Sequence, residues 1–191
     1  HAHFNLGSIL KDLGKLQEAE VSTRKATQLK PDFFQAHLNL GAILKDLGKL
    51  QEAEVSARKA VELKPDFFQA HLNLGATLQN LGKLEEAEIS TRKAVELNPD
   101  YAIGYFNLGN ILKEIGDLEG AEKSLRKTIK LNPNFAGAHH SLSIVYSLEN
   151  KHNKAYEEIE LAIKLDPANH TYQGELTRIK FLAGEDDDDI N

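Results

Sequence analysis

The sequence predicts an all-helical fold in which helix–turn–helix hairpins stack along the chain as a solenoid. Three observations support this fold class. The chain matches itself when it is shifted by 34 residues, each period holds two apolar stripes with helical spacing, and glycine and proline interrupt the stripes at fixed positions. Because one such hairpin cannot bury its apolar face alone, neighbouring hairpins must stack to be stable.

The 34-residue period is carried by positions that hardly vary. Residues 3–36 and 37–70 are identical at 29 of 34 positions. The five prolines of the chain fall in one register, and one leucine and one alanine of each period do the same. The recurring positions are Leu6, Leu40, Leu74, Leu108 and Leu142; Ala19, Ala53, Ala87, Ala121 and Ala155; and Pro31, Pro65, Pro99, Pro133 and Pro167.

The second period shows how each repeat divides into two helices. Apolar residues in 34–47 step by three and four, as they do on one face of a helix. Gly48 ends this helix, because glycine readily adopts the left-handed backbone that follows a helix C-terminus. A second stripe runs over 50–63 and stops before Pro65, which cannot continue a helix.

Two local signals predict details of these hairpins. Gly41 and Ala53 are expected where the two helices meet, because small side chains allow the backbones to approach closely. In the next turn, Asp66 and Gln69 have the three-residue spacing of a capping box, so we expect Asp66 to cap the helix that follows.

The period divides the chain into five repeats and a C-terminal remainder. After the last proline the apolar pattern continues but no second helix follows, so we expect 168–184 to be a single helix that caps the last hairpin. Residues 185–191 hold five negative charges and are expected to form an acidic disordered tail or linker. The repeats span 1–167, at approximately 1–33, 34–67, 68–101, 102–135 and 136–167.

Composition argues against several classes of function. The chain has no cysteine, which excludes disulfides, thiolate metal sites and cysteine nucleophiles. Its net charge of −6 comes mainly from the acidic tail, so nucleic acid is not an expected partner. The chain shows no signal segment and no apolar run of membrane-spanning length, which predicts a cytoplasmic protein that does not contact a membrane. Since the chain starts at His1 and lacks methionine, we expect a segment of a longer protein.

The recurring Leu-Gly, Ala and Pro positions resemble the tetratricopeptide repeat family over residues 1–167. Within it, residues 31–45 (Pro-x-Phe-x-x-Ala-His-x-Asn-Leu-Gly-x-x-Leu-Lys) are most similar to the repeats of O-linked N-acetylglucosamine transferases and their bacterial relatives. The resemblance implies right-handed superhelical stacking, with a concave groove lined by the first helix of each repeat. In those transferases the corresponding asparagines hold the backbone of an extended peptide. The fifth repeat departs from the pattern, because Ser143 replaces a glycine and Asn150 replaces another.

An asparagine recurs in the first helix of four repeats and predicts a peptide-binding groove. Asparagine is a mediocre residue inside a helix, yet its amide offers one acceptor and two donors to another backbone. Packed helices lie ~8–10 Å apart, about three residues of an extended peptide, so such a ladder would hold about eight or nine residues. The predicted groove residues are Asn5, Asn39, Asn73, Asn107, Leu38, Leu72, Phe106, Lys45, Asp46, Gln79 and Asn80.

An internal role is the alternative for these asparagines. Their amides would then cap a helix or bridge to the adjacent helix, or the residues would simply be copied when the repeat was duplicated. The resemblance also implies a second binding mode, a clamp of lysine and arginine that grips a C-terminal carboxylate. That clamp is not expected here, because its lysine and arginine positions hold residues such as Leu38 and Asn39.

Two further sets of side chains recur, and neither predicts metal binding or catalysis. The histidines of the first helices lie one repeat apart, ~8–10 Å, whereas zinc requires ligands within about 2.1 Å of the ion. The arginines of the second helices are expected on the convex side, exposed or paired with glutamates such as Glu54 and Glu88. These sets are His3, His37, His71 and His139, and Arg24, Arg58, Arg92 and Arg126.

The sequence therefore predicts a protein-binding scaffold that holds an extended peptide or partner segment in a concave groove. No phosphate loop, nucleophile motif or zinc-binding helix motif is present, so no catalytic residue, metal or cofactor is predicted. Two alternatives stay open. One is a module that forms homo-oligomers through the solenoid ends or through exposed aromatic residues at the repeat junctions. The other is the substrate-recruiting arm of a larger transferase-type enzyme.

Overall fold

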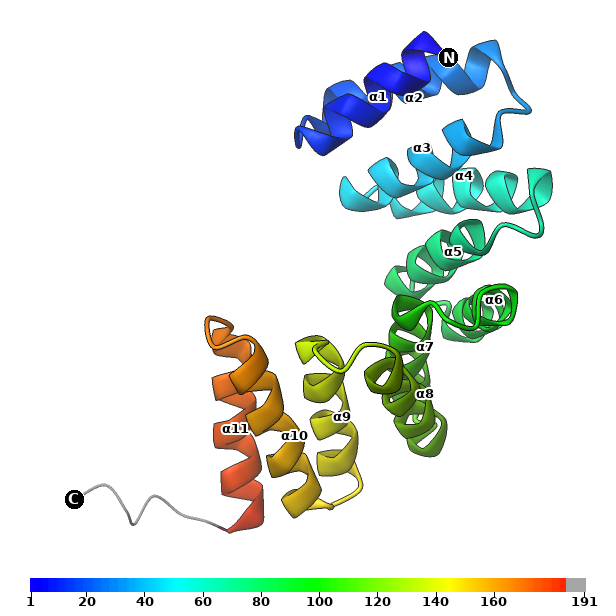
Figure 1. Cartoon of the computed structure of the whole chain (residues 1–191). Coiled ribbons are helices and arrows are strands. Elements are labelled where there is room, and N and C mark those ends of the chain that lie inside the picture. The colour runs from blue at the N-terminus through cyan, green and yellow to red at the C-terminus, as the bar shows by residue number, and fades with distance from the viewer. Residues whose placement is uncertain (185–191) are drawn as a thin grey trace. The chain divides into compact units, whose positions relative to one another are not determined.

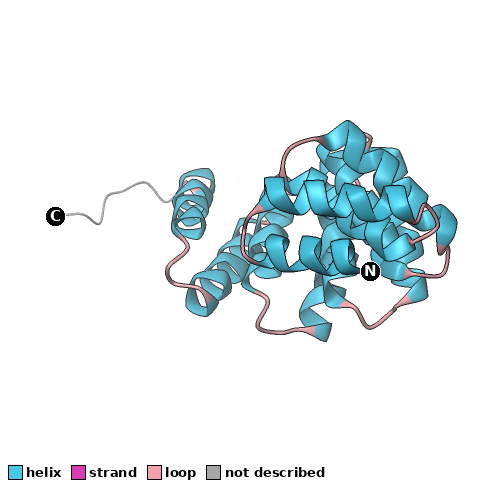
Figure 2. Ribbon diagram, turned by 90° about the horizontal axis from the view of Figure 1, so that it is seen from above, coloured by secondary structure: helices cyan, strands magenta, loops and turns pink. Residues whose placement is uncertain are grey.

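The computed structural model describes residues 1–184 and contains only helices and turns over that range, as the sequence predicts (Figures 1 and 2). The predicted acidic tail, 185–191, lies outside the described residues. The described helices form five hairpins followed by α11 (His170–Ala183). The hairpins are α1 (Ala2–Asp12) with α2 (Leu16–Leu29), α3 (Phe34–Asp46) with α4 (Leu50–Leu63), α5 (Phe68–Asn80) with α6 (Leu84–Leu97), α7 (Ala102–Ile115) with α8 (Leu118–Leu131), and α9 (Ala136–Leu148) with α10 (His152–Leu165).

The helices form two compact units, and the boundary in the sequence falls between Pro99 and Asp100. Unit 1 holds α1 to α6 and unit 2 holds α7 to α11. Within a unit, each second helix contacts the first helix of its own hairpin and the first helix of the next. Within each unit the backbones of consecutive first helices also come close to one another, whereas those of the described second helices do not. The first helices therefore form an inner layer in each unit, and the second helices form an outer layer.

The two helices of a hairpin meet through small residues. A Cβ atom added to Gly41 would lie 3.3 Å from the backbone nitrogen of Ala57 and 3.5 Å from the carbonyl oxygen of Ala53. Ala53 and Ala57 are both fully buried. The structure thus places Gly41 and Ala53 at the predicted contact, and larger side chains there would force the helices apart.

The outer face of α1 shows how much burial a neighbouring repeat supplies. Leu6 and Ile9 on this face are 47% and 56% exposed. Their counterparts in α3, Leu40 and Ile43, are at most 4% exposed, and α2 packs against that helix. Stacking of the preceding second helix is therefore what buries this face, as expected for repeats that are stable only together.

The turn inside each hairpin uses the left-handed backbone that the sequence predicts. Gly48 has a φ of 73° two residues after the end of α3. In the fifth repeat, Asn150 occupies the corresponding position with a φ of 58°. Asparagine is among the few residues other than glycine that adopt this conformation readily, so this departure from the repeat pattern preserves the turn.

The capping-box prediction is wrong. α5 begins at Phe68 with Phe67 at the N-cap, and no side chain caps the helix. Asp66 lies one residue too early in the chain and pairs instead with Lys64, at 3.3 Å. The turn is closed by backbone, because the N–H of Phe67 donates to the carbonyl oxygen of Lys64 at 3.2 Å.

Replacing Ala53 by leucine should destabilise the fold, because the added atoms have no space between α3 and α4. We expect Ala53→Leu to lower the free energy of unfolding by about 1–3 kcal/mol, which thermal melting followed by circular dichroism would measure. Val55→Leu is the matched control, since Val55 lies on the same helix and is 70% exposed. A melting temperature of Ala53→Leu equal to that of the parent would show that this contact has been misassigned.

Candidate functional site

Two of the recurring asparagines, Asn39 and Asn73, bridge consecutive first helices in unit 1. In unit 1, Asn39 Nδ2 donates to Ser8 Oγ of α1 at 3.3 Å. One repeat later, Asn73 Nδ2 donates to the backbone carbonyl oxygen of Leu38 in α3 at 3.0 Å. One amide donor of each asparagine is therefore engaged inside the protein, as the alternative interpretation of the sequence requires.

The remaining amide oxygen of Asn73 is unsatisfied. Asn73 Oδ1 is buried and has no hydrogen-bond partner among residues 1–184. A buried acceptor without a partner costs about 1–3 kcal/mol, so an N–H group that reached this oxygen would gain that free energy. The bond from Nδ2 to Leu38 fixes the orientation of the amide at the same time. Asn73 is thus a preoriented acceptor on the inner layer.

The other predicted groove residues divide between the two units. Unit 1 holds Asn5 on α1, Leu38, Asn39, Lys45 and Asp46 on α3, and Leu72, Asn73, Gln79 and Asn80 on α5, whereas unit 2 holds Phe106 and Asn107 on α7. Leu72 is buried, which removes most of its side chain from any ligand. The Lys45 ammonium lies 3.4 Å from the carboxylate of Asp46, so these two charges largely neutralise each other.

The inner layer of unit 2 is bridged differently. Ser141 takes the asparagine position in the fifth repeat and donates to Asn110 Oδ1 of α7 at 2.9 Å. Lys113 Nζ lies 3.4 Å from the same oxygen. Burial lowers the pKa of Lys113 from its ordinary value. Beside them, the rings of Phe106 and Phe135 pack edge to face with centroids 4.8 Å apart.

The outer layer of unit 1 carries a network of ion pairs that joins one repeat to the next. Glu20 of α2 accepts hydrogen bonds from Lys49 of the following repeat at 2.8 Å and from Arg24 on its own helix. Arg24 in turn reaches Glu52 of the following repeat. We call this arrangement the outer charge clamp. It recurs one repeat later with Glu54, Arg58, Lys83 and Glu86.

The clamp glutamates are held in the ionised state. The hydrogen bond from Lys49, followed by that from Arg24, lowers the pKa of Glu20 below its ordinary value although the carboxyl is largely shielded from water. Lys83 and then Arg58 have the same effect on Glu54. These arginines pair with glutamates on their own helices, as expected, whereas their partners in the neighbouring repeat were not predicted.

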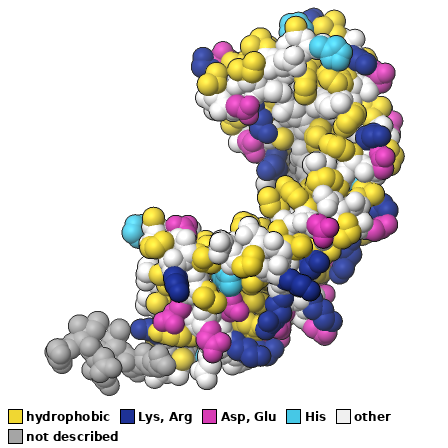
Figure 3. Space-filling view, viewed as in Figure 1, with side chains coloured by type: hydrophobic (Ala, Val, Ile, Leu, Met, Phe, Trp, Pro, Cys, Tyr) yellow, Lys and Arg dark blue, Asp and Glu magenta, His cyan; other side chains and the backbone are white. Residues whose placement is uncertain are grey.

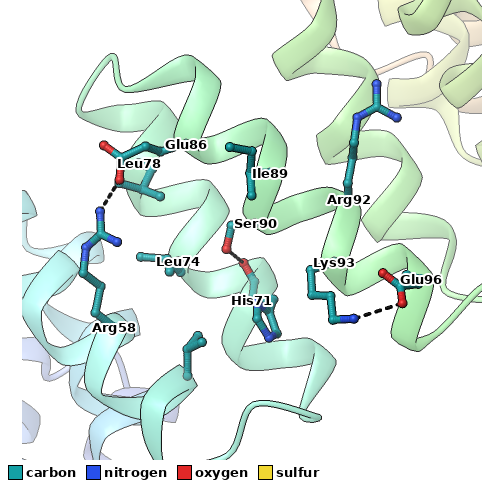
Figure 4. A pocket seen from close by; sticks show the side chains of 11 residues that line it. Arg58, His71, Leu74, Leu78, Glu86, Ile89, Ser90, Arg92, Lys93 and Glu96 are labelled. Carbon is teal, nitrogen blue, oxygen red and sulfur yellow. Dashed lines mark hydrogen bonds and ion pairs between the residues drawn. The ribbon is translucent and has the colours of Figure 1, made fainter.

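A surface cavity of about 600 Å³ lies over α5, between α4 and α6 (Figure 4). His71, Leu74 and Leu78 follow a spacing of three and four residues and so present one face of α5 to it. Leu72 and Gln79 each follow one of these residues directly, about 100° farther around the helix, and do not line the cavity. This cavity was not predicted from sequence, although the exposed apolar position that recurs in the second helices signals it. The recurring residues are Val21, Val55 and Ile89, each about 70% exposed.

The histidines of the first helices close the turns between repeats. His37 Nε2 lies 2.9 Å from the carbonyl oxygen of Pro31, and His71 Nε2 lies 2.8 Å from that of Pro65. These bonds explain why histidine recurs at this position. Within residues 1–184, no group of three or more histidine, aspartate or glutamate side chains is arranged to hold a metal ion.

His139 makes the same contact and adds an ionic one. Its Nε2 lies 3.2 Å from the carbonyl oxygen of Pro133, and its Nδ1 lies 2.7 Å from Glu158 Oε2. Both ring nitrogens donate in this arrangement only when the imidazole is protonated. The hydrogen bond to Glu158 accordingly raises the pKa of His139, in spite of its burial.

The surface visible in Figure 3 mixes basic and acidic side chains with apolar patches. None of the helices in residues 1–184 is long and apolar enough to cross a membrane.

Comparison with known proteins identifies the repeat. Models of the tetratricopeptide repeat match residues 1–33, 34–67, 68–101, 102–135 and 136–169. A comparison with curated proteins gives no match.

Several solved structures resemble this chain in fold. PilF of Pseudomonas aeruginosa is 21% identical over 96% of this chain and 84% of its own, with a TM-score of 0.83. A MamA segment from Desulfovibrio magneticus RS-1 is 21% identical over 88% and 95% of the two chains, with a TM-score of 0.79. YrrB, described as a TPR protein with an unusual peptide-binding site, is 23% identical over 90% and 89%, with a TM-score of 0.74.

The His139–Glu158 pair should make stability depend on pH. Because the pKa of His139 is raised in the folded state, the pair stabilises the fold fully below the unfolded pKa of about 6.5 and loses this contribution as pH rises through the folded pKa. Glu158→Ser places at this position the residue found at Ser90, two repeats earlier. We expect the melting temperature of the parent to exceed that of Glu158→Ser by more at pH 5.5 than at pH 9. A difference that does not change with pH would contradict the ionic role of this pair.

Proposed function

This chain belongs to the tetratricopeptide repeat family, and we propose that it is a scaffold that binds an extended segment of a partner protein along the inner layer of first helices. Tetratricopeptide repeats mediate protein–protein interactions. The single observation that carries the proposal is Asn73, whose amide is fixed by its bond to Leu38 while its oxygen lacks a partner. The description of YrrB as a peptide-binding protein supports the same class of function.

In this proposal each inner asparagine divides its amide between the scaffold and the ligand. Nδ2 of Asn39 and Asn73 stays on the preceding first helix, and Oδ1 accepts an N–H from the backbone of the bound segment. For Asn73 the side chains that cover Oδ1 must then turn aside on binding. Because the acceptor is oriented before binding, little additional side-chain entropy is lost. The similarity of residues 31–45 to the repeats of O-linked N-acetylglucosamine transferases supports this mode.

Such a groove would select its ligand by shape more than by sequence. A neutral amide oxygen pairs with the backbone N–H of any residue except proline. At intervals of about three ligand residues, side chains between the contacts point elsewhere and tolerate substitution. Lys45, Asp46, Gln79 and Asn80 are the polar groups placed to adjust this preference.

Two alternative functions have less support than peptide binding. Self-association through the solenoid ends or through aromatic residues at the repeat junctions is a second candidate function that the sequence alone suggests. The role of a recruiting arm within a larger transferase rests on the motif similarity alone. We assign no catalytic activity to this segment, and its cytoplasmic location stays a prediction.

The double variant Asn39→Ala, Asn73→Ala should weaken peptide binding. The probe is a fluorescein-labelled nine-residue peptide selected from a random array against the unmodified chain, and fluorescence polarisation measures its affinity. Two hydrogen bonds of about 1 kcal/mol each correspond to roughly a thirtyfold loss. Replacing backbone N–H groups of the peptide by N-methyl groups at every third residue should cause a comparable loss.

The controls separate binding from stability. The asparagine changes also remove bonds between helices, so circular dichroism must show that the double variant is folded at the temperature used. Asn153→Ala, an exposed asparagine on the second helix α10, should bind as the parent does. The proposal fails if the folded double variant keeps the parental affinity, or if N-methylation has no effect.

A further inference from the structure

The outer face of α8 in unit 2 carries a stripe of basic side chains. Its members lie three and four residues apart, so they project from one face of the helix. Three of the four are exposed, and the other is half-buried. Lysine and arginine side chains gather over this part of unit 2 in Figure 3. We call this set the basic stripe, and its members are Lys123, Arg126, Lys127 and Lys130.

Comparison with unit 1 shows that the stripe is particular to α8. Lys123 replaces an apolar residue that is about 70% exposed in α4 and in α6. Lys130 replaces a glutamate, which is Glu62 in α4 and Glu96 in α6. That glutamate pairs with the lysine three residues before it, as Glu96 does with Lys93 at 2.9 Å. In α8 a lysine therefore stands where unit 1 provides a carboxylate.

Two lysines of the stripe are left without a carboxylate. Neither Lys127 nor Lys130 forms an ion pair within residues 1–184, and Lys127 lies over the ring of Tyr105 in α7, 5.6 Å from its centroid. In unit 1, Lys59 occupies the position of Lys127 with a repeat packed on either side of it. It pairs there only with Glu62 of its own helix. The missing pair in unit 2 therefore follows from the sequence of α8 itself.

The following repeat adds cations beside the stripe. The position of Lys154 holds a glutamate in α4 and in α6, and that glutamate pairs with the clamp arginine of the preceding repeat. In unit 2, Lys154 and Arg126 lie instead over the ring of Tyr146, 5.5 and 5.8 Å from its centroid. Lys151 lies 5.7 Å from the same centroid. This junction thus has a further cation where the outer charge clamp has a carboxylate.

Few negative charges offset these cations. Burial of Tyr146 raises its pKa to about 12, so the phenol stays neutral. Glu122 accepts hydrogen bonds from Arg126 Nε at 2.8 Å and from the hydroxyl of Tyr146 at 2.9 Å, which occupies its carboxylate. Two further carboxylates at this surface, Glu119 and Glu149, each bind a lysine. Within the described residues, the six cations thus form ion pairs with only three carboxylates.

We propose that this surface, the basic stripe together with Lys151 and Lys154, binds an acidic segment of a partner protein. The partner supplies the carboxylates that unit 1 provides from its own helices at the positions of Lys130 and Lys154. Along α8 the rise from Lys123 to Lys127 is about 6 Å, and that from Lys127 to Lys130 is about 4.5 Å. Alternate residues of an extended chain point to one side at intervals of about 6.6 Å, so acidic residues at alternate positions match the stripe.

An acidic protein segment fits this surface better than other polyanions. Proteins that bind nucleic acid present an extended basic footprint, whereas this chain has a net charge of −6 and the stripe covers one face of one helix. Stable binding to a membrane surface requires apolar anchoring as well as basic side chains, and Lys123 has replaced the exposed apolar residue of α4 and α6. A glutamate, by contrast, is the group that pairs at these positions in unit 1. The surface lies on the outer layer and does not involve the inner asparagines.

An acidic peptide tests the proposal directly. The probe is a fluorescein-labelled octapeptide in which glutamate alternates with serine, and fluorescence polarisation measures its affinity for the full chain. We expect saturable binding that weakens about tenfold for the double variant Lys127→Ala, Lys130→Ala, which removes two charge contacts of about 0.7 kcal/mol each. A peptide with glutamine in place of glutamate should not bind. Lys130→Glu restores the residue found at Glu62 and Glu96, so it should pair with Lys127 and weaken binding as strongly, whereas Lys130→Arg should keep it.

Matched controls separate this surface from general attraction and from the inner groove. Lys25→Glu changes the net charge by as much as Lys130→Glu does, at the position of α2 that corresponds to Lys127. This variant, and the double variant Asn39→Ala, Asn73→Ala, should bind the peptide as the parent does. All variants keep the acidic residues 185–189, so any competition from them is common to all, and circular dichroism must show each variant folded.

Four results would overturn the proposal. The first is a parent chain that shows no saturable binding of the acidic peptide. The second is parental affinity in folded Lys130→Glu or in the double lysine variant, and the third is an equal loss of affinity in Lys25→Glu. The fourth is an oligonucleotide of ten thymidines that binds through Lys127 and Lys130 more tightly than the peptide does.

Discussion

The close approach of the two helices in each hairpin is the constraint on which the rest of the structure depends. At Gly41 the backbone of α3 comes so near to that of α4 that an added Cβ would lie 3.3 Å from the nitrogen of Ala57. Contact at this distance sets how the two helices of a hairpin are oriented. The apolar side chains that lie outside this contact then pack against the neighbouring repeat. The separation into an inner layer of first helices and an outer layer of second helices follows, and with it the inner surface to which we assign peptide binding.

The apolar core and the outer charge clamp stabilise unit 1 in different ways. Fully burying a side chain such as Ile43 contributes roughly 1.5–3 kcal/mol, whereas an exposed ion pair contributes at most about 1 kcal/mol. The clamp therefore adds little to stability. Its position is more informative, because the bond from Lys83 to Glu54 joins each repeat to the next at one defined point.

Much of this fold could be predicted because the same signals for helices and turns recur in each repeat of the sequence. A helix boundary such as Gly48 occurs in several copies, and periodicity is a local property that tertiary context seldom overrides. The capping box failed because the helix begins one residue later than the spacing implies, so that Phe67 and not Asp66 takes the N-cap position. The cavity over α5 could not be predicted either, since it depends on the distance between the backbones of α4 and α6. The inner asparagines stand between these cases, because sequence indicates the position of Asn73 but not where its amide points.

The histidine contacts at the turns have a consequence for how opening of the array is observed. His37, His71 and His139 each hold the carbonyl oxygen of a proline six residues earlier, so each ring senses one junction between repeats. The hydrogen bond on Nε2 slows exchange of the ring proton with water as long as its own junction is closed. Three imidazole resonances would therefore report separately on three places along a nearly repetitive chain. A stack of near-copies, in which most amide signals overlap, thus carries its own set of distinguishable local probes.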